Sequence, residues 1–245
     1  FANSAVSFIR QYGFDGVDVD YEYPTSMKDA GNPNDFPLSN QCRAKLFANY
    51  EVLMKTLRNK LDSAGTEDGR KYMLTIASPA SAYLLRGMEN FQVTQYLDYV
   101  NLMTYDFHGA WNHFVGHNAA LFDNKADPEL AQWGVYNQAQ FGAIGYLNSA
   151  WAAHYFRGAL AAGKINIGVP YYTRGWQGVT GGTHGLGGKA ALPSQSACQP
   201  GTGGSTVPCG NGAVGIDNIW HDLDKNGKEI GGGAVPMWHA KNLEH

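Results

Sequence analysis

The stretch from Asp15 to Pro24 constrains the fold of this chain more than any other, because it sets acidic side chains at alternate positions of an apolar, β-favouring run. In a β-strand alternate side chains share a face, so Asp18, Asp20 and Glu22 should point one way and the intervening Val and Tyr side chains the other. Carboxylates this close together do not all ionise freely, and one should stay protonated near neutral pH, as a general acid requires. The stretch therefore predicts a catalytic acid; an exposed strand with a solvated acidic face, or a cation site, is the alternative.

Helical and strand patterns alternate along the chain, with apolar residues at helical spacing between β-favouring runs. The predicted elements are, in order, a helix at Ala2–Tyr12, a strand at Phe14–Tyr23, a helix at Gln41–Ala64 that Gly65 ends, a strand at Tyr72–Ala77, a helix at Asn90–Tyr96, a strand at Tyr99–Tyr105, a helical region at Gln138–Ala162 and a strand at Lys164–Tyr171. This order predicts parallel strands joined by right-handed crossovers, and hence an α/β fold.

Composition excludes several classes of partner. The 245 residues are 44% hydrophobic and 16% charged with a formal net charge of −3, and they contain neither a basic run nor an apolar run long enough to span a membrane. Nucleic acid and membranes are therefore not expected as partners. The chain also lacks a phosphate-cradling glycine loop, a His-Glu-x-x-His motif and a Gly-x-Ser-x-Gly elbow. We expect no cofactor and no metal.

The three cysteines bear on the compartment. Cys198 and Cys209 flank a loop rich in Gly, Pro, Ser and Thr, and a disulfide between them would staple it, as in a secreted protein. Cys42 is then left over, either free or without its partner.

Polar and aromatic residues gather where three of the predicted strands end. The residues concerned are Glu22, Met103, Tyr105, Asp106, Tyr172 and Arg174. The carboxyl ends of parallel strands meet at one edge of a sheet, which is where barrels of alternating strands and helices keep their active sites. We therefore expect these side chains to converge on one site.

The motif Asp-x-x-Asp-x-Asp-x-Glu resembles the signature of glycoside hydrolase family 18, which comprises chitinases and related endo-N-acetylglucosaminidases. Met103–Asp106 resembles the motif on the sixth strand of that family, and Tyr172–Trp176 the motif after its seventh. The resemblance implies a (β/α)8 TIM barrel of which this chain holds strands four to seven. Residues 1–177 would form this partial barrel, and residues 178–245 the start of a Gly-rich α+β insertion.

The same resemblance leaves strands one to three and strand eight unaccounted for. An open half barrel would have two unpaired sheet edges, which is a costly state. We therefore expect either a self-dimer or a complementing fragment to supply the missing strands.

The resemblance also implies roles for the residues. Glu22 would protonate the glycosidic oxygen and later activate water, while the substrate's own 2-acetamido oxygen attacks the anomeric carbon with net retention. Asp20 would orient that acetamido group, Asp18 would share a proton with Asp20, and Tyr105 would hydrogen-bond the acetamido oxygen. Asp15 would support the strand.

Substrate-binding roles follow from the same comparison. Met103 would line the pocket floor, Asp106 and Arg174 would bind sugar hydroxyls or steady the loops, and Tyr172 would border the subsite at the scissile bond. Trp111 would stack on a sugar ring or simply pack in its loop.

The expected activity is thus hydrolysis of β-1,4-linked N-acetylglucosamine polymers, with chitin or chito-oligosaccharides as ligands and secretion as the expected location. Three alternatives remain open: an endo-β-N-acetylglucosaminidase acting on glycans, a non-catalytic chitin-binding lectin, and an inactive fragment of the same fold. Lectins on this scaffold typically lose the acid at the position of Glu22, which is present here.

Overall fold

The computed structural model describes residues 1–30, 36–88, 91–109, 112–176, 178–190 and 213–214. The chain divides into two compact units. The first comprises Phe1–Met103 and Ala152–Gly168, and the second Thr104–Trp151 and Val169–His245. None of the helices in the described part of the chain combines the length and the apolar character that a membrane span requires.

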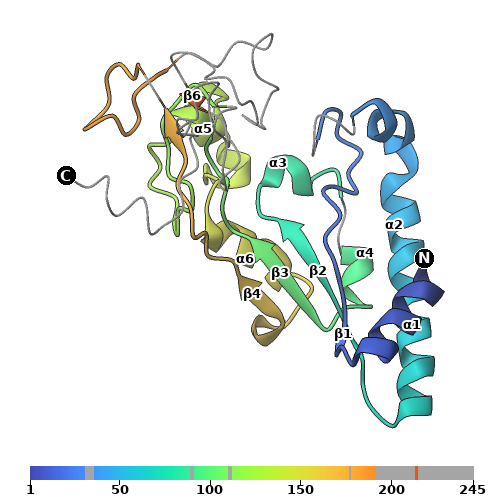
Figure 1. Cartoon of the computed structure of the whole chain (residues 1–245). Coiled ribbons are helices and arrows are strands. Elements are labelled where there is room, and N and C mark those ends of the chain that lie inside the picture. The colour runs from blue at the N-terminus through green and yellow to red at the C-terminus, as the bar shows by residue number, and fades with distance from the viewer. Residues whose placement is uncertain (31–35, 89–90, 110–111, 177, 191–212, 215–245) are drawn as a thin grey trace, which may run out of the picture. The chain divides into compact units, whose positions relative to one another are not determined.

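A four-stranded parallel sheet forms the centre of the first unit (Figure 1). Its strands are β1 (Gly16–Val19), β2 (Met73–Pro79), β3 (Tyr99–Met103) and β4 (Ile165–Ile167), side by side in that order. The prediction of parallel strands, taken in chain order, is confirmed. The carboxyl ends of all four strands consequently lie at the same end of the sheet.

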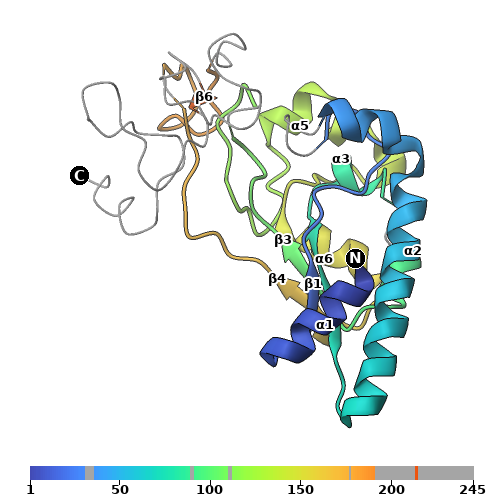
Figure 2. The same ribbon diagram turned by 45° about the vertical axis from the view of Figure 1, so that its right-hand side comes forward.

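Helices α1 (Ala2–Tyr12) and α2 (Phe36–Asp68) lie against the sheet. The other helices of the unit are α3 (Ala82–Leu85), α4 (Phe91–Thr94) and α6 (Ser149–Arg157), whose last six residues belong to this unit, with a 3-10 turn at Ala162–Lys164. In both views α1 lies alongside α2 (Figures 1 and 2).

The core lies between α2 and the sheet. Met54, Leu57 and Leu61 of α2 are fully buried, as are the alternate strand residues Leu74, Ile76, Val100 and Leu102. Burying an aliphatic side chain of this size contributes about 1.5–3 kcal/mol, so this layer stabilises the unit. The intervening strand residues face away from the helices.

The long helix α2 corrects two expectations. It begins at Phe36 rather than Gln41, and it runs through Gly65 to Asp68. Gly65 is needed because a Cβ at this position would overlap the backbone oxygen of Arg70, not because it ends the helix. The helix ends at Gly69, whose φ of 65° is the left-handed conformation that glycine adopts readily.

The first strand is shorter than predicted. β1 pairs with β2 only from Gly16 to Val19, so Asp20 and Glu22 lie beyond the ladder and the strict alternation does not reach Glu22. β3 likewise ends at Met103, two residues before Tyr105. β3 ends opposite Pro79, the last residue of β2, whereas β1 stops pairing at Ile76 although β2 continues to Pro79.

The second unit contains short elements only within its described residues. They are α5 (Pro128–Gln132), 3-10 turns at Val135–Asn137 and Ala139–Phe141, and an antiparallel pair of β5 (Gly175–Trp176) with β6 (Ala213–Val214). The predicted helical region at Gln138–Ala162 is wrong in its extent, because its α-helix, α6, starts only at Ser149. The Asn148 side chain accepts a hydrogen bond from the Trp151 N–H and so caps α6 there.

One carboxylate ties α2 to the sheet. Asp98, just before β3, accepts hydrogen bonds from Arg58 of α2 and from the backbone N–H of Leu74, both at 3.0 Å, and it also pairs with Lys71. Burial alone would raise the pKa of Asp98, but the Lys71 and Leu74 bonds and the charges of Lys71 and Arg58 outweigh it and lower this pKa. The Arg58–Asp98 pair is largely buried, with side chains 14% and 11% exposed.

Replacing Asp98 by Asn should therefore lower the free energy of unfolding at pH 7 by about 2 kcal/mol, because it removes a hydrogen-bonded charge next to a buried guanidinium. Since the folded-state pKa of Asp98 is depressed, its contribution is complete above the unfolded value of about 4 and is lost as pH falls through the folded value. Urea unfolding of the two proteins at pH 7 and pH 3 would measure both effects.

Asp62→Asn is the matched control. Asp62 pairs with the same Arg58, but its side chain is 61% exposed, so its loss should change stability by less than about 0.5 kcal/mol. Equal effects of the two substitutions, or a loss at Asp98 that does not shrink in acid, would contradict the assigned role.

Candidate active site

The acidic row lies at the carboxyl end of β1. Asp18 is in the strand, Asp20 and Glu22 follow it, and all three side chains are exposed. The aromatic ring of Tyr21 lies 6.3 Å from that of Tyr50, a residue of α2 that is only 4% exposed. Burial raises the pKa of Tyr50, and the negative charges of Asp18 and Asp20 raise it further. A neutral phenol therefore lies close to the two aspartates.

Asp18 is held by side chains from the neighbouring strands. Its Oδ1 accepts hydrogen bonds from the Thr75 hydroxyl of β2 and, at 3.0 Å, from Asn101 Nδ2 of β3. Asn101 Oδ1 in turn accepts a bond of 2.8 Å from Asn166 Nδ2 of β4. Sequence reasoning missed these three donors, although Asn101 and Asn166 are polar interruptions of otherwise apolar strands and could have signalled the site.

Two further predicted residues of the first unit lie around this row. Asp15 pairs with Arg70, and its backbone oxygen accepts a 2.9 Å bond from the Met73 N–H. Asp15 thus links the start of β1 to the start of β2. Met103 is the last residue of β3, is partly exposed, and shares its face of the sheet with Asn101.

A second cluster forms around Asp106 in the second unit. Asp106 Oδ1 accepts hydrogen bonds from the Tyr172 hydroxyl at 2.5 Å and from Arg174 Nε at 2.9 Å, and one terminal nitrogen of Arg174 lies 2.5 Å away. Arg174 is 2% exposed and Asp106 is 37% exposed. Burial raises the pKa of Tyr172, and its hydrogen bond to Asp106 adds to the effect. The ring of Tyr105 lies 6.1 Å from that of Tyr172, edge-on.

Asn118 joins the two loops that carry this cluster, and no sequence pattern predicted it. Its Oδ1 accepts a 2.9 Å bond from the Asp106 N–H, and its Nδ2 donates a 3.1 Å bond to the Tyr172 backbone oxygen. Asp106 has a φ of 58°, a left-handed conformation that is uncommon outside glycine. The Asn118 bond to its N–H helps to hold that conformation.

The structure thus brings the predicted residues together in two groups. Asp18, Asp20 and Glu22 belong to the first unit, and Tyr105, Asp106, Tyr172 and Arg174 to the second. Trp111, Cys198 and Cys209 lie outside the described residues. Cys42 is exposed and forms no disulfide within the described residues.

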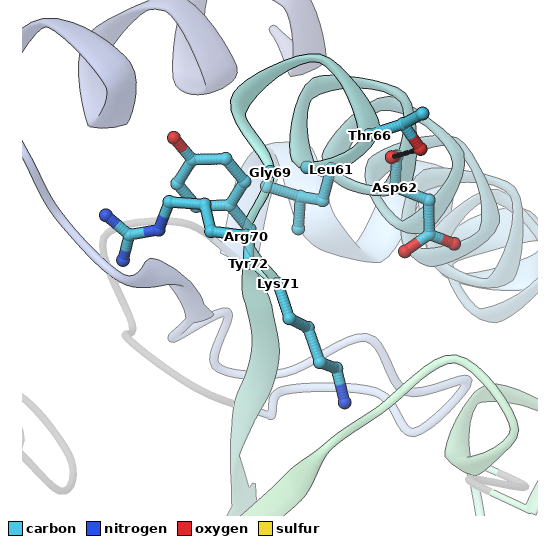
Figure 3. A pocket seen from close by; sticks show the side chains of 8 residues that line it. Leu61, Asp62, Thr66, Gly69, Arg70, Lys71 and Tyr72 are labelled. Carbon is cyan, nitrogen blue, oxygen red and sulfur yellow. Dashed lines mark hydrogen bonds between the residues drawn. The ribbon is translucent and has the colours of Figure 1, made fainter.

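A cavity of about 530 Å³ lies at the other end of β2, between the last turns of α2 and residues 69–72 (Figure 3). Figure 3 shows Arg70 and Lys71 extending from it in different directions. It opens at the amino end of β2, whereas barrel active sites lie at the carboxyl ends of strands. This cavity is therefore not the candidate active site.

Residues 1–227 match the model of the family described as "Glycosyl hydrolases family 18". The chain belongs to glycoside hydrolase family 18. This confirms the resemblance of the acidic motif and assigns the four parallel strands to a (β/α)8 barrel.

Named members of family 18 agree with this assignment. The chain is 40% identical over 211 residues to chitinase A1 of Niallia circulans, a match that covers 84% of this chain and 26% of that protein. The crystal structure of a family 18 chitinase from Chromobacterium violaceum covers all of this chain, which spans 35% of it, with 57% identity and a TM-score of 0.85. A family 18 N-acetylglucosaminidase from Paenibacillus barengoltzii matches at 32% identity and a TM-score of 0.61, over 77% of this chain and 49% of that one.

The chain spans about a quarter to a half of the length of the relatives it matches. The share is 26% for the Niallia circulans protein. It is 35% and 49% for the two solved structures.

Tyr172→Phe should weaken the second cluster. The substitution removes one donor to the Asp106 carboxylate, and it should lower the free energy of unfolding by about 1 kcal/mol, since Asp106 is partly solvated. Tyr171→Phe is the matched control, because Tyr171 is 72% exposed and should change stability by less than about 0.5 kcal/mol. Urea unfolding followed by tryptophan fluorescence measures both, and equal effects would argue against the cluster.

Proposed function

We propose that this protein hydrolyses β-1,4-linked N-acetylglucosamine polymers, that is, chitin, and that Glu22 is its general acid and base. The observation that carries the proposal is the intact Asp-x-x-Asp-x-Asp-x-Glu row following β1 in a chain that belongs to family 18. Glu22 follows a strand of the parallel sheet at its carboxyl end, the edge at which barrel enzymes carry out their chemistry. The chitinases among the relatives support chitin as the substrate class.

The proposed mechanism uses the substrate as its own nucleophile. Most retaining glycosidases place two carboxyl groups on either side of the scissile bond, but the acids here follow one strand. Glu22 would protonate the leaving oxygen while the 2-acetamido oxygen attacks the anomeric carbon and forms an oxazolinium ion. Water activated by Glu22 would then open this ion, and the configuration at the anomeric carbon would be retained.

The aspartates would stabilise the positive charge of this intermediate. Asp20 would accept a hydrogen bond from the acetamido N–H and balance the positive charge that develops. Asp18 would share a proton with Asp20, and the donors to Asp18 support its placement beside that residue. Tyr105 would donate a hydrogen bond to the acetamido oxygen.

The remaining residues would bind the sugars. Met103 would form the pocket floor, and Tyr172 would border the subsite at the scissile bond. Asp106 and Arg174 would bind hydroxyls or steady the loops, and their mutual hydrogen bonds support the second of these roles. Trp111 as a stacking platform, residues 178–245 as an insertion and the Cys198–Cys209 disulfide stay predictions.

The alternative function is endo-β-N-acetylglucosaminidase activity on glycans. The match to an N-acetylglucosaminidase favours it to the extent that the same acidic row serves both substrates. Release of glycans from a glycoprotein in the absence of chito-oligosaccharide cleavage would select it. A chitin-binding lectin is disfavoured because Glu22 is present.

Glu22→Gln should abolish hydrolysis of a fluorogenic chitobioside. Loss of the proton donor should lower kcat at least about 100-fold with little change in KM, because the amide keeps the shape of the side chain. Glu51→Gln, the same change on α2, is the matched control and should leave kcat unchanged. Full activity in Glu22→Gln would refute the assignment.

Turnover by this chain should also be compared with its mass in solution. Pairing with a second copy or with a complementing fragment is part of the proposal, and a mass above that of one chain in the active sample would support it. Secretion is likewise proposed, since chitin is a polymer too large to enter a cell.

The proposed attack by the substrate's own acetamido group can be tested separately. A cellobioside, which carries a hydroxyl in place of the 2-acetamido group, should not be hydrolysed, and a thiazoline analogue of the oxazolinium ion should inhibit competitively. Proton NMR of the first product formed should show the β anomer. An initial α anomer would exclude the proposed mechanism.

A further inference from the structure

A hydrogen-bonded line of side chains crosses all four strands on the face opposite the helices. It runs from Asn166 of β4 to Asn101 of β3 and on to Asp18 of β1, and Thr75 of β2 joins it at the same oxygen of Asp18. Asn101 and Asn166 are Cα partners in the parallel ladder, as are Asp18 and Thr75. Paired residues of adjacent parallel strands point to the same side, so the backbone register itself brings these groups together.

The contact between β1 and β3 passes over β2. Strands two apart in a sheet are separated by about 10 Å, and a direct bond between their side chains requires a small residue in between. Ala77 of β2 is the Cα partner of Asn101, and its methyl group leaves that space open. Asn101 can therefore reach the Asp18 carboxylate at 3.0 Å.

Hydrogen-bond donors and acceptors can follow one another along this line in only one order. A carboxylate only accepts hydrogen bonds, so the NH2 end of the Asn101 amide must face Asp18. The carbonyl end of Asn101 then faces β4, where only a donor is compatible with it, and Asn166 presents its Nδ2 at 2.8 Å. Reversing either amide would set two acceptors or two donors against each other, so Asn166 holds Asn101 in the orientation that Asp18 requires.

We propose that Asn101, oriented by Asn166, acts with Thr75 as a positioning device for the Asp18–Asp20 pair. This inference rests on the proposed function. Both donors bind Oδ1 of Asp18, so they stabilise its anionic form and leave the proton shared by the pair to Oδ2 and Asp20. Neither asparagine touches the substrate in this scheme; they act through Asp18.

The line is not required to build the core. The apolar side chains that stabilise the unit are on the opposite face, where Val100 and Leu102 alternate with Asn101. Asn101 is half-buried, and Asp18 and Asn166 are exposed. The two asparagines interrupt the apolar pattern of their strands on the face away from the core, so a role in the chemistry explains them better than a role in folding.

The first arm of the test needs no turnover. In nitrogen–proton correlation spectra of the labelled chain, the side-chain amide signals of Asn101 should shift in Asp18→Asn and in Asn166→Leu. Asn49→Leu, on the exposed side of α2, should leave these signals where they are. Backbone amide signals of β2 and β3 report whether each variant has kept its sheet.

The second arm measures kcat and KM on the fluorogenic chitobioside. Asn101→Leu and Thr75→Val should each lower kcat about tenfold with little change in KM, because each removes one hydrogen bond to a charged group. Thr75→Ser keeps the hydroxyl and should restore kcat.

The outcomes separate the inference from the proposed function. Asn101 amide signals that do not shift in Asp18→Asn, or a kcat that is unchanged in Asn101→Leu, would overturn the positioning role. Coupled Asn101 signals in a chain without any turnover would count against the proposed function and support the hydrogen-bonded line.

Discussion

The parallel sheet has one face that packs on the helices and one that does not, and the rest of this structure depends on that division. Val100 and Leu102 are buried toward the helices, and Met54, Leu57 and Leu61 of α2 close that layer. Because side chains alternate along a strand, this burial sends every second residue to the opposite face. Asp18, Asn101 and Asn166 occupy that second face, where they do not compete with the core.

Carboxylates organise both groups of candidate residues, and in each case a few hydrogen-bond donors position a negative charge. Thr75 and Asn101 bind Asp18, while Tyr172 and Arg174 bind Asp106. Hydrogen bonds to a charged group are stronger than those between neutral groups. Two donors therefore restrict the orientation of a carboxylate more than its rotamer preference alone would. Such positioning is what a reaction with a developing positive charge requires of the protein.

The alternating strands, their parallel order and the acidic row could be predicted from the sequence, because each depends on local patterns that persist over many residues. Element ends could not. Gly65 looked like the end of α2, yet the close approach of Arg70 explains it, and Gly69 ends the helix instead. β1 ends at Val19, although its pattern continues to Glu22 and the neighbouring strand β2 runs on to Pro79.

The sequence by itself determined the family and the parallel α/β architecture and marked the acidic row as the candidate site, since a motif as long and unusual as Asp-x-x-Asp-x-Asp-x-Glu carries its own information. Only the tertiary structure decided what these acids contact. Asn101 and Asn166 are 83 and 148 positions from Asp18 in the chain, and nothing local marks them as its neighbours. Strand register places them within hydrogen-bonding distance, and register is set by pairing between strands that are remote in sequence.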